Sequence, residues 1–296
     1  MNFLAYILFK VFVLVMSLLP LRSALGLGKA LGAVCYRLAG SRRTLALSNI
    51  RRAFGDSKSE GEVCEIAAGM FRSLGMMLVE FARLRSVDKA YIDKYVSFEG
   101  LEHFERAVKR GKGAVCLTAH YDNWELLNAA LSLKGFPMGV VARPLDNPYL
   151  NSYTEKVRSA FGGRVIDKTN ALRGMLGLLK GNGVLGILLD QRSSTKEGVM
   201  VDFFGTPAST SKGLAAIALK TDTVVIPVFI RRLNGPYHKV ECMEPVELVQ
   251  SGNKAEDNRD NTQRFTRAIE DYVRRYPEQW FWLHSRWERR KKAKKG

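Results

Sequence analysis

A histidine and a glutamate lie five residues apart, with Tyr121-Asp122-Asn123-Trp124 between His120 and Glu125. An imidazole of near-neutral pKa can accept a proton from a hydroxyl group that attacks a carbonyl carbon, and a carboxylate can hold that imidazole in the required tautomer. On one continuous helix, residues five apart point about 140° away from each other. The two side chains can therefore cooperate only if the chain changes direction between them.

The local sequence predicts such a change of direction. Residues 113–119 form an apolar run typical of a buried strand, and residues 126–131 are typical of a helix. His120 would then end the strand and Glu125 would lie in the first helical turn, at a strand-to-helix junction where α/β proteins bind ligands. Two structural alternatives use the same segment. His120 could merely cap a loop, and Asp122 with Glu125 could form a capping box.

Three further charged side chains are candidates for the same edge of the sheet. Arg143 follows one predicted strand, Asp190 ends another, and Arg158 belongs to the helix after Arg143. Strand ends of a parallel sheet gather at one edge, where an arginine can bind a phosphate group or stabilise an oxyanion. The structural alternative is an ion pair between Arg158 and Asp190 that only stabilises the fold.

Strands and helices alternate along most of the chain, which predicts an α/β fold with a mixed, largely parallel central sheet flanked by helices. The length of 296 residues fits one such domain, expected over 23–288. One or two helices are expected over 57–84. The expected strands are 95–98, 113–119, 137–142, 164–166, 184–189, 223–229 and 238–243. The expected helices are 101–109, 123–133, 148–161, 170–180, 210–220 and 257–276.

The net charge of +17 indicates acidic partners, which could be nucleic acid, anionic lipid headgroups or an acidic carrier protein. The four cysteines have neither metal-ligand nor disulfide spacing, and they are expected to act as small hydrophobes in a reducing compartment. The chain contains no Walker A sequence, no complete dinucleotide fingerprint and no G-x-S-x-G elbow. Neither a cofactor, nor a metal, nor a serine acyl-enzyme is therefore expected.

The N-terminus predicts a location on a membrane. Residues 2–19 are almost wholly apolar apart from Lys10, and the basic stretch that follows contains no acidic residue before Asp56. This pattern predicts a membrane-anchoring helix over 1–22, with the catalytic domain on the cytoplasmic side. Lys10 keeps open an interfacial helix whose lysine reaches the headgroups. A signal peptide or a buried core helix would also give an apolar run at this position.

Aromatic and basic residues near the C-terminus indicate a second contact with the membrane. Arginines are interleaved with four aromatic residues, which are Trp280, Phe281, Trp282 and Trp287. This combination predicts an interfacial aromatic belt, with core packing as the alternative. The basic tail over 289–296 is too charged to pack and would strengthen attachment to anionic lipid.

His-x4-Glu after an apolar strand resembles the signature of the glycerolipid and lipid A acyltransferases, and the Asn-Trp-Glu version is similar to that of the bacterial late (lauroyl/myristoyl) lipid A acyltransferases. The resemblance continues in family order through blocks at 143–148, 188–191, 201–208 and 277–287. It therefore covers nearly the whole chain.

The resemblance implies a glycerolipid-acyltransferase-like fold and an acyltransferase of the inner membrane. A fatty acyl chain would move from acyl carrier protein or CoA to a hydroxyl group of a lipid A precursor or related glycolipid. His120 would be the general base and Glu125 would orient it. The implied substrate-binding or oxyanion residues are Arg143, Arg158 and Asp190. The implied lining residues of the acyl or acceptor pocket are Trp124, Phe203 and Phe204, although core packing is the default for paired phenylalanines.

One departure and two further hypotheses remain. Many members of that family have Phe-Gly where this chain has Tyr121-Asp122, and a carboxylate beside the base would raise its pKa or help to bind the acceptor. The same mechanism could act on another acceptor, such as a glycosylated phosphoinositide or an aminolipid. A nucleic-acid-binding protein would explain the charge, but it gives no reason for the apolar N-terminus, so nucleic acid is not expected as a partner.

Overall fold

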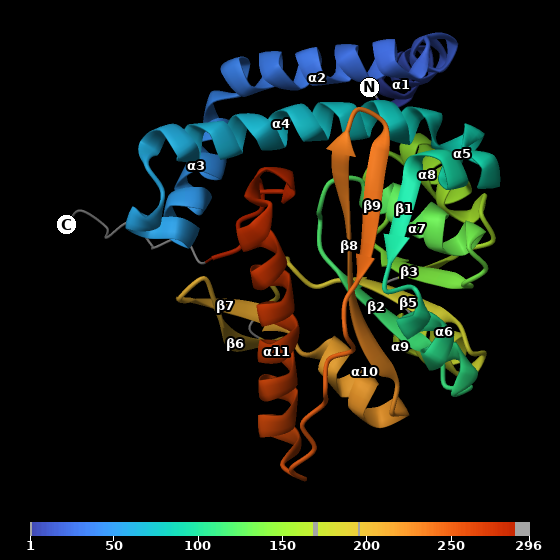
Figure 1. The fold of residues 1–296 in the computed structure, drawn as a ribbon, viewed down its shortest axis with the longest axis vertical. Helices are drawn as coiled ribbons and strands as arrows, with labels where there is room; N and C mark the ends of the chain where they lie inside the picture. The colour runs from blue at the N-terminus through green and yellow to red at the C-terminus, as the bar shows by residue number, and fades with distance from the viewer. Residues whose placement is uncertain (1, 168–170, 195, 288–296) are drawn as a thin grey trace.

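Seven strands form the central sheet within the residues that the structure describes, which are 2–167, 171–194 and 196–287. In this computed structural model, every neighbouring pair of strands is parallel except β8 and β9. The strands in sheet order are β1 (Val96–Glu99), β9 (Tyr237–Cys242), β8 (Val224–Asn234), β2 (Ala114–Thr118), β5 (Val184–Leu188), β3 (Met138–Ala142) and β4 (Arg164–Asp167). The predicted α/β fold with a largely parallel sheet is confirmed (Figure 1).

Strand β2 separates the two cores of the domain. All five of its residues are buried, as expected for a parallel strand covered on both faces. Val115 and Leu117 face one core, whereas Ala114 and Cys116 face the other. The first core is closed by α9 (Ala171–Lys180), α10 (Gly213–Thr221) and α11 (Lys254–Arg275), and the second by α6 (Glu102–Lys109), α7 (Trp124–Leu133) and α8 (Pro148–Ser159).

An antiparallel hairpin that the sequence pattern did not predict follows β5. It consists of β6 (Gly198–Phe203) and β7 (Thr206–Ser211). Because β7 continues to Ser211, helix α10 begins at Gly213 and not at the predicted residue 210. The hairpin packs against α11 (Figure 1).

The aromatic residues near the C-terminus belong to the first core. Trp280, Trp282 and Trp287 are 1%, 0% and 3% exposed. The rings of Trp280 and Trp287 contact Phe203, and Trp282 contacts Phe204. The predicted interfacial belt is therefore wrong for these tryptophans, because their apolar surface closes the core over the hairpin turn. The predicted basic tail lies outside the described residues.

The N-terminal helices form a layer beside the sheet (Figure 1). They are α1 (Asn2–Leu18), α2 (Leu21–Leu38), α3 (Gly40–Phe54), α4 (Glu60–Arg83) and α5 (Lys89–Tyr95). Helix α4 starts at a capping box in which Ser59 and Glu62 exchange side-chain to backbone hydrogen bonds. Many of its residues are buried. Some pack against α2, and others pack against the sheet domain.

Glycines allow α2 and α4 to touch backbone to backbone. A Cβ added at Gly28 would lie 2.6 Å from the carbonyl oxygen of Gly75, and a Cβ at Gly75 would overlap the carbonyl oxygen of Gly28. Gly32 likewise faces the backbone of Phe71. Any side chain at these positions would force the two helices apart.

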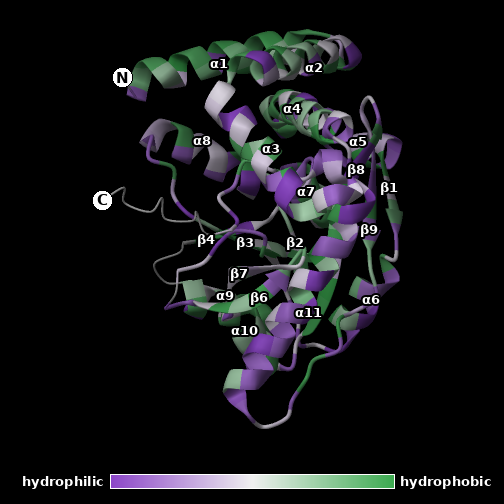
Figure 2. Ribbon diagram, turned by 90° about the vertical axis from the view of Figure 1, so that its left-hand side faces the viewer, coloured by the Kyte–Doolittle hydropathy of each residue, from purple (hydrophilic) through white to green (hydrophobic). Residues whose placement is uncertain are grey.

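Many of the large apolar side chains of α1 and α2 lie on the surface. On α1 they follow a helical spacing, and the exposed residues include Leu4, Leu8, Val11, Val15 and Leu18. On α2 the exposed stripe contains Leu27, Leu31, Val34 and Leu38. Figure 2 shows α1 as a largely apolar helix at the top of the molecule, with α2 beside it.

Within the described ranges, no helix combines the length and the apolar character that a membrane crossing requires. The predicted N-terminal membrane helix is therefore not supported as a spanning segment.

The contact between α2 and α4 predicts a contrast between two glycine substitutions. Gly75→Ala should lower stability by about 1–3 kcal/mol, because the new methyl group overlaps the backbone of α2. Gly26→Ala, on the exposed face of α2 with no atom within 4 Å of the added Cβ, should raise stability by up to about 1 kcal/mol. Thermal unfolding followed by circular dichroism measures both. Equal midpoints for the two variants would contradict the close packing.

Candidate active site

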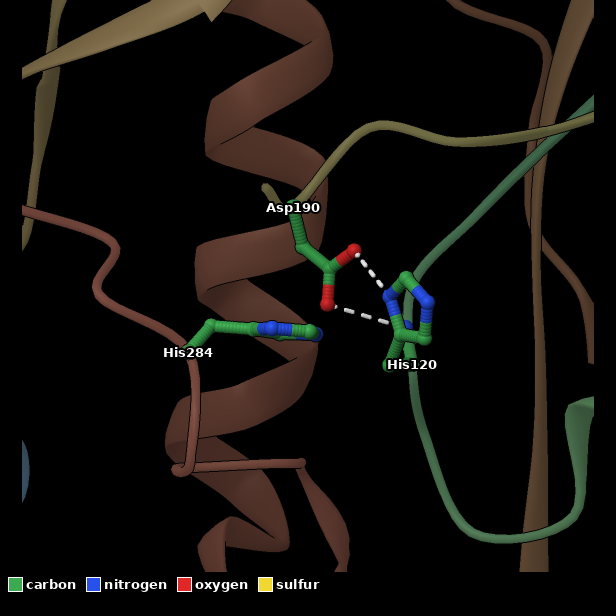
Figure 3. Close-up of side chains that lie close together, drawn as sticks. All are labelled: His120, Asp190 and His284. Atoms are coloured by element: carbon green, nitrogen blue, oxygen red, sulfur yellow. Dashed lines mark hydrogen bonds and ion pairs between the residues drawn. The ribbon is translucent and has the colours of Figure 1, made fainter. Parts of the chain in front are cut away.

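The geometry of the site begins with two adjacent parallel strands in register. Thr118 at the end of β2 pairs with Leu188 at the end of β5. His120 and Asp190 each follow two residues later, so the two side chains leave the sheet at the same edge. The Nδ1 atom of His120 lies 2.8 Å from Oδ1 of Asp190, and the backbone N–H of His120 donates to Oδ2 at 2.9 Å (Figure 3).

Asp190 is fully buried and charged. Its Oδ2 also accepts a hydrogen bond from Nε1 of Trp280 at 2.9 Å. Burial acts to raise the pKa of Asp190, but His120, His284 and the hydrogen bonds together hold that pKa below its ordinary range. A carboxylate can only accept, so we assign the proton of the His120 imidazole to Nδ1. The Nε2 atom is then the basic atom of the ring.

A second histidine lies against the first. The rings of His120 and His284 pack edge to face at 4.7 Å, and Nε2 of Gln191 lies 3.2 Å and 3.3 Å from the two Nε2 atoms. Burial lowers the pKa of His284 to about 4, so this ring is neutral at physiological pH. The roles of His284 and Gln191 were missed by sequence reasoning, although both lie in blocks that carry the family resemblance.

No hydrogen bond or ion pair joins Glu125 to His120 in the described structure, so the predicted role of Glu125 as the orienting carboxylate finds no support there. Its carboxylate binds Arg158 instead, with Nε of Arg158 3.0 Å from Oε2. Helix α7 begins at Trp124 with Asn123 as its N-cap, which accepts from the N–H of Leu126 at 3.0 Å. Glu125 is therefore at the second helical position and faces α8.

Two structural alternatives for the charged residues are also wrong. Asn123, not Asp122, caps α7, so the capping box with Glu125 does not form. Arg158 pairs with Glu125, so its expected ion pair with Asp190 does not form. Burial acts to lower the pKa of Arg158, but the charge and hydrogen bonds of Glu125 raise it above its ordinary value.

A cavity of about 1550 Å³ opens at this edge of the sheet. His120, Trp124, Glu125 and Arg158 line it together. Its apolar wall comes from β3, β5, α9 and α10 and includes Val141, Met175, Ile187, Leu214 and Ile217. Basic side chains also line it, among them Lys196, Lys212, Lys220 and Lys254. The cavity thus offers an apolar surface and positive charge beside the histidine.

The remaining predicted residues divide into two groups. Trp124 packs edge to face against His120 at 4.9 Å, and Arg143 lines the cavity while its side chain is 77% exposed. Phe203 and Phe204 are 1% and 5% exposed and are absent from the lining of this cavity in the described residues. The hairpin turn directs both rings into the core, so their expected role as pocket residues finds no support in this cavity.

Three metal-ligating side chains meet at the site. Ligand atoms of His120, Asp190 and His284 lie within 4.8 Å of one another. Both oxygens of Asp190 already accept hydrogen bonds from His120 and Trp280. These hydrogen bonds already compensate the carboxylate of Asp190 and do not involve Nε2 of His120, which fits a role of that atom in proton transfer.

The chain is similar to acyltransferases of bacterial glycolipids. Residues 2–289 match the family model described as bacterial lipid A biosynthesis acyltransferase. The chain is 30% identical to the lipid A biosynthesis acyltransferase of Haemophilus influenzae, over 66% of this chain and 60% of that protein. It is 25% identical to the lipid A biosynthesis palmitoleoyltransferase of Escherichia coli, over 73% and 69%. It is 28% identical to the phosphatidylinositol mannoside acyltransferase of Mycolicibacterium smegmatis, over 50% of each chain.

The charge of Asp190 predicts a pH-dependent contribution to stability. Because its folded-state pKa lies below the unfolded value of about 4, its stabilising effect is present above that pH and is lost as the pH falls through the folded-state pKa. The free energy of unfolding of the wild type should exceed that of Asp190→Asn above about pH 5, and the difference should shrink below about pH 4. Urea unfolding at each pH measures this difference. A difference that stays constant at the lowest pH would contradict the assigned carboxylate.

Proposed function

Because the chain belongs to the bacterial lipid A biosynthesis acyltransferase family, we propose that it transfers a fatty acyl chain from an acyl thioester to a hydroxyl group of a lipid A precursor or related glycolipid. The donor would be acyl carrier protein or CoA. The observation that carries the proposal is the His120–Asp190 pair, which lies beside a cavity with an apolar wall.

In the proposed reaction, Nε2 of His120 removes the proton of the acceptor hydroxyl as its oxygen attacks the thioester carbonyl carbon. The charge of Asp190 stabilises the imidazolium that forms. Collapse of the tetrahedral intermediate breaks the carbon–sulfur bond, and the imidazolium returns the proton to the leaving thiolate. The products are an ester and a free thiol, and the cycle forms no covalent bond to the protein.

Arg158 and Arg143 are the proposed anion-binding groups. The guanidinium of Arg158 is fixed in the cavity wall by Glu125, so it can offset negative charge on a substrate phosphate or on the oxyanion. The role of Glu125 is then to position this arginine. The exposed Arg143 can reach a phosphate of the donor or acceptor at the cavity rim. Trp124 covers one edge of His120 and limits the access of water.

The acceptor has a second candidate. The similarity to a phosphatidylinositol mannoside acyltransferase favours a mannosylated phosphoinositide as the alternative glycolipid. The same histidine, carboxylate and cavity would serve either hydroxyl acceptor.

The proposed location is the cytoplasmic face of the inner membrane. Apolar stripes on α1 and α2 are exposed, and the net charge of +17 is complementary to anionic headgroups. Both stripes have the spacing of a single helix face, which suits helices that lie in the interface. The exposed side chains would bury themselves among the lipid headgroups and the upper acyl chains.

Replacement of His120 should abolish transfer. Mass spectrometry of products from acyl carrier protein thioesters and a tetra-acylated lipid A precursor should show the gain of one acyl group. His120→Gln should reduce the rate by about 10²- to 10⁴-fold, because general-base catalysis is lost. The matched control is His103→Gln, since His103 is buried in α6 and does not line the cavity.

Equal rates for the wild type and His120→Gln would reject the proposed base. Transfer to a mannosylated phosphoinositide but not to the lipid A precursor would favour the alternative acceptor.

The exposed stripe of α1 predicts direct binding to lipid. The double substitution Leu8→Glu with Val15→Glu should weaken binding to vesicles that contain anionic phospholipid by roughly 100-fold or more, because each lost contact contributes about 1.5 kcal/mol or more. Flotation at high salt measures the apolar part of the binding. Leu233→Glu, at an exposed leucine on β8, is the control and should bind like the wild type. Unchanged flotation of the double variant would contradict the proposed orientation.

A further inference from the structure

Four ionisable side chains meet in the interior beneath the loop that carries His120. They are Glu80, Asp122, Arg232 and His238, and none is more than 8% exposed. The guanidinium of Arg232 binds both oxygens of Glu80, at 2.7 Å and 2.6 Å, and lies 3.5 Å from Oδ1 of Asp122. The Nε2 atom of His238 lies 3.1 Å from Oδ2 of Asp122. We call this group the buried charge cluster.

The cluster acts directly on the two residues that follow Tyr121. Oδ1 of Asp122 accepts a hydrogen bond from Oγ of Ser73 at 2.6 Å, and Nδ2 of Asn123 donates to Oε2 of Glu80 at 2.8 Å. Asp122 has a φ of 36°, a conformation that L-amino acids rarely adopt. The loop therefore keeps an unfavourable backbone conformation because buried partners hold its side chains.

The buried charge cluster also contacts residues 279–281, which bind both His120 and Asp190. The side chain of Gln279 exchanges two hydrogen bonds with the backbone of Arg232, at 2.8 Å and 3.1 Å. The backbone carbonyl of Gln279 accepts from the N–H of Asp122 at 2.8 Å. The next residue, Trp280, donates to Asp190, and the N–H of Phe281 donates to the carbonyl of His120 at 2.9 Å. The contacts of residues 279–281 thus hold both His120 and Asp190 in position.

The carboxylate of Asp122 is compensated within the cluster. Nδ1 of His238 lies 3.0 Å from the carbonyl of Pro236, and Nε2 lies 3.1 Å from Oδ2 of Asp122. Burial acts to raise the pKa of Asp122, but Arg232, His238 and Ser73 hold it below its ordinary range. The two carboxylates therefore face the guanidinium of Arg232 and the imidazole of His238.

Stability alone does not account for such a cluster. Replacing a buried ion pair by apolar side chains of similar volume is often neutral or stabilising. Asp122 belongs to the turn that follows His120. Its contacts with the side chains around it therefore fix the direction of that turn.

We propose that Asp122 is a positioning residue for acyl transfer, which fixes the turn after His120 through its contacts with Ser73, Arg232 and His238. The inference rests on the proposed function, in which His120 is the base. Asp122 itself points away from the cavity and is not among its lining residues in the described part of the chain.

Asp122→Asn tests this role, because asparagine has the same size and tolerates a positive φ but lacks the charge. The kcat of the folded variant should fall about 10- to 100-fold, since a small displacement of a base is enough for such a loss. KM should stay within about threefold, because no group that lines the cavity is changed. Ser73→Ala removes only the hydrogen bond to Oδ1 and should lower kcat in the same direction by a smaller factor, which keeps the test valid if Asp122→Asn does not fold.

The control for a merely structural loss is Glu270→Gln. Glu270 is also a buried glutamate, 2% exposed, which accepts from the N–H of Phe204 at 2.7 Å and binds Arg274, both of which lie outside the loop. This substitution should lower the unfolding temperature without lowering kcat. Wild-type kcat in Asp122→Asn and Ser73→Ala, or an equal fall of kcat in Glu270→Gln, would overturn the inference.

A parallel assay of His120→Gln separates the two proposals. If His120→Gln is inactive while Asp122→Asn is fully active, only the positioning role fails. If His120→Gln remains active, the proposed base fails and the positioning role fails with it.

Discussion

The hydrogen bonds that converge on the buried carboxylate of Asp190 are the constraint on which the site depends. A charge in the interior is tolerated where hydrogen bonds compensate its lost hydration. Asp190 obtains them from the side chain and backbone of His120 and from the indole of Trp280. These donors come from two parts of the chain that are far apart, so the strand edge and the C-terminal segment must both be in place before the histidine is oriented.

The two carboxylates near His120 have different tasks because they start from different elements. Asp190 leaves the strand next to that of His120 and meets the imidazole at the edge of the sheet. Glu125 lies one residue inside a helix that runs away from this edge, and it meets Arg158 on the neighbouring helix. Asp190 thus supports the proposed base, whereas the pair of Glu125 and Arg158 presents a fixed guanidinium to the cavity. In the proposed reaction, this division separates proton transfer from the binding of anionic groups.

The helical layer combines tight packing inside with an apolar surface outside. Gly28 and Gly75 bring α2 into backbone contact with α4, and α4 carries Ser73 and Glu80 to the loop of the site. The opposite faces of α1 and α2 expose leucine and valine side chains. Helix α4 is therefore the element that joins the proposed lipid-facing layer to the catalytic loop.

The sequence by itself determined the features that depend on local periodicity. The apolar run before His120 predicted β2, the helical spacing over 57–84 predicted α4, and the alternation of elements predicted a largely parallel sheet. The position of His120 at a strand end followed from the same pattern. These features are encoded locally because strand and helix repeats determine which side chains face a core.

Only the tertiary structure decided which side chains meet. His120 pairs with Asp190, 70 residues away, because β2 and β5 are neighbours in register, whereas the nearby Glu125 faces another helix. The tryptophans near the C-terminus have the sequence pattern of an interfacial belt but pack in the core. Asp122 points into the buried charge cluster and not toward the proposed base. Local sequence reports burial and period, but the partner of a polar side chain depends on strand order and helix direction, which arise from packing of the whole chain.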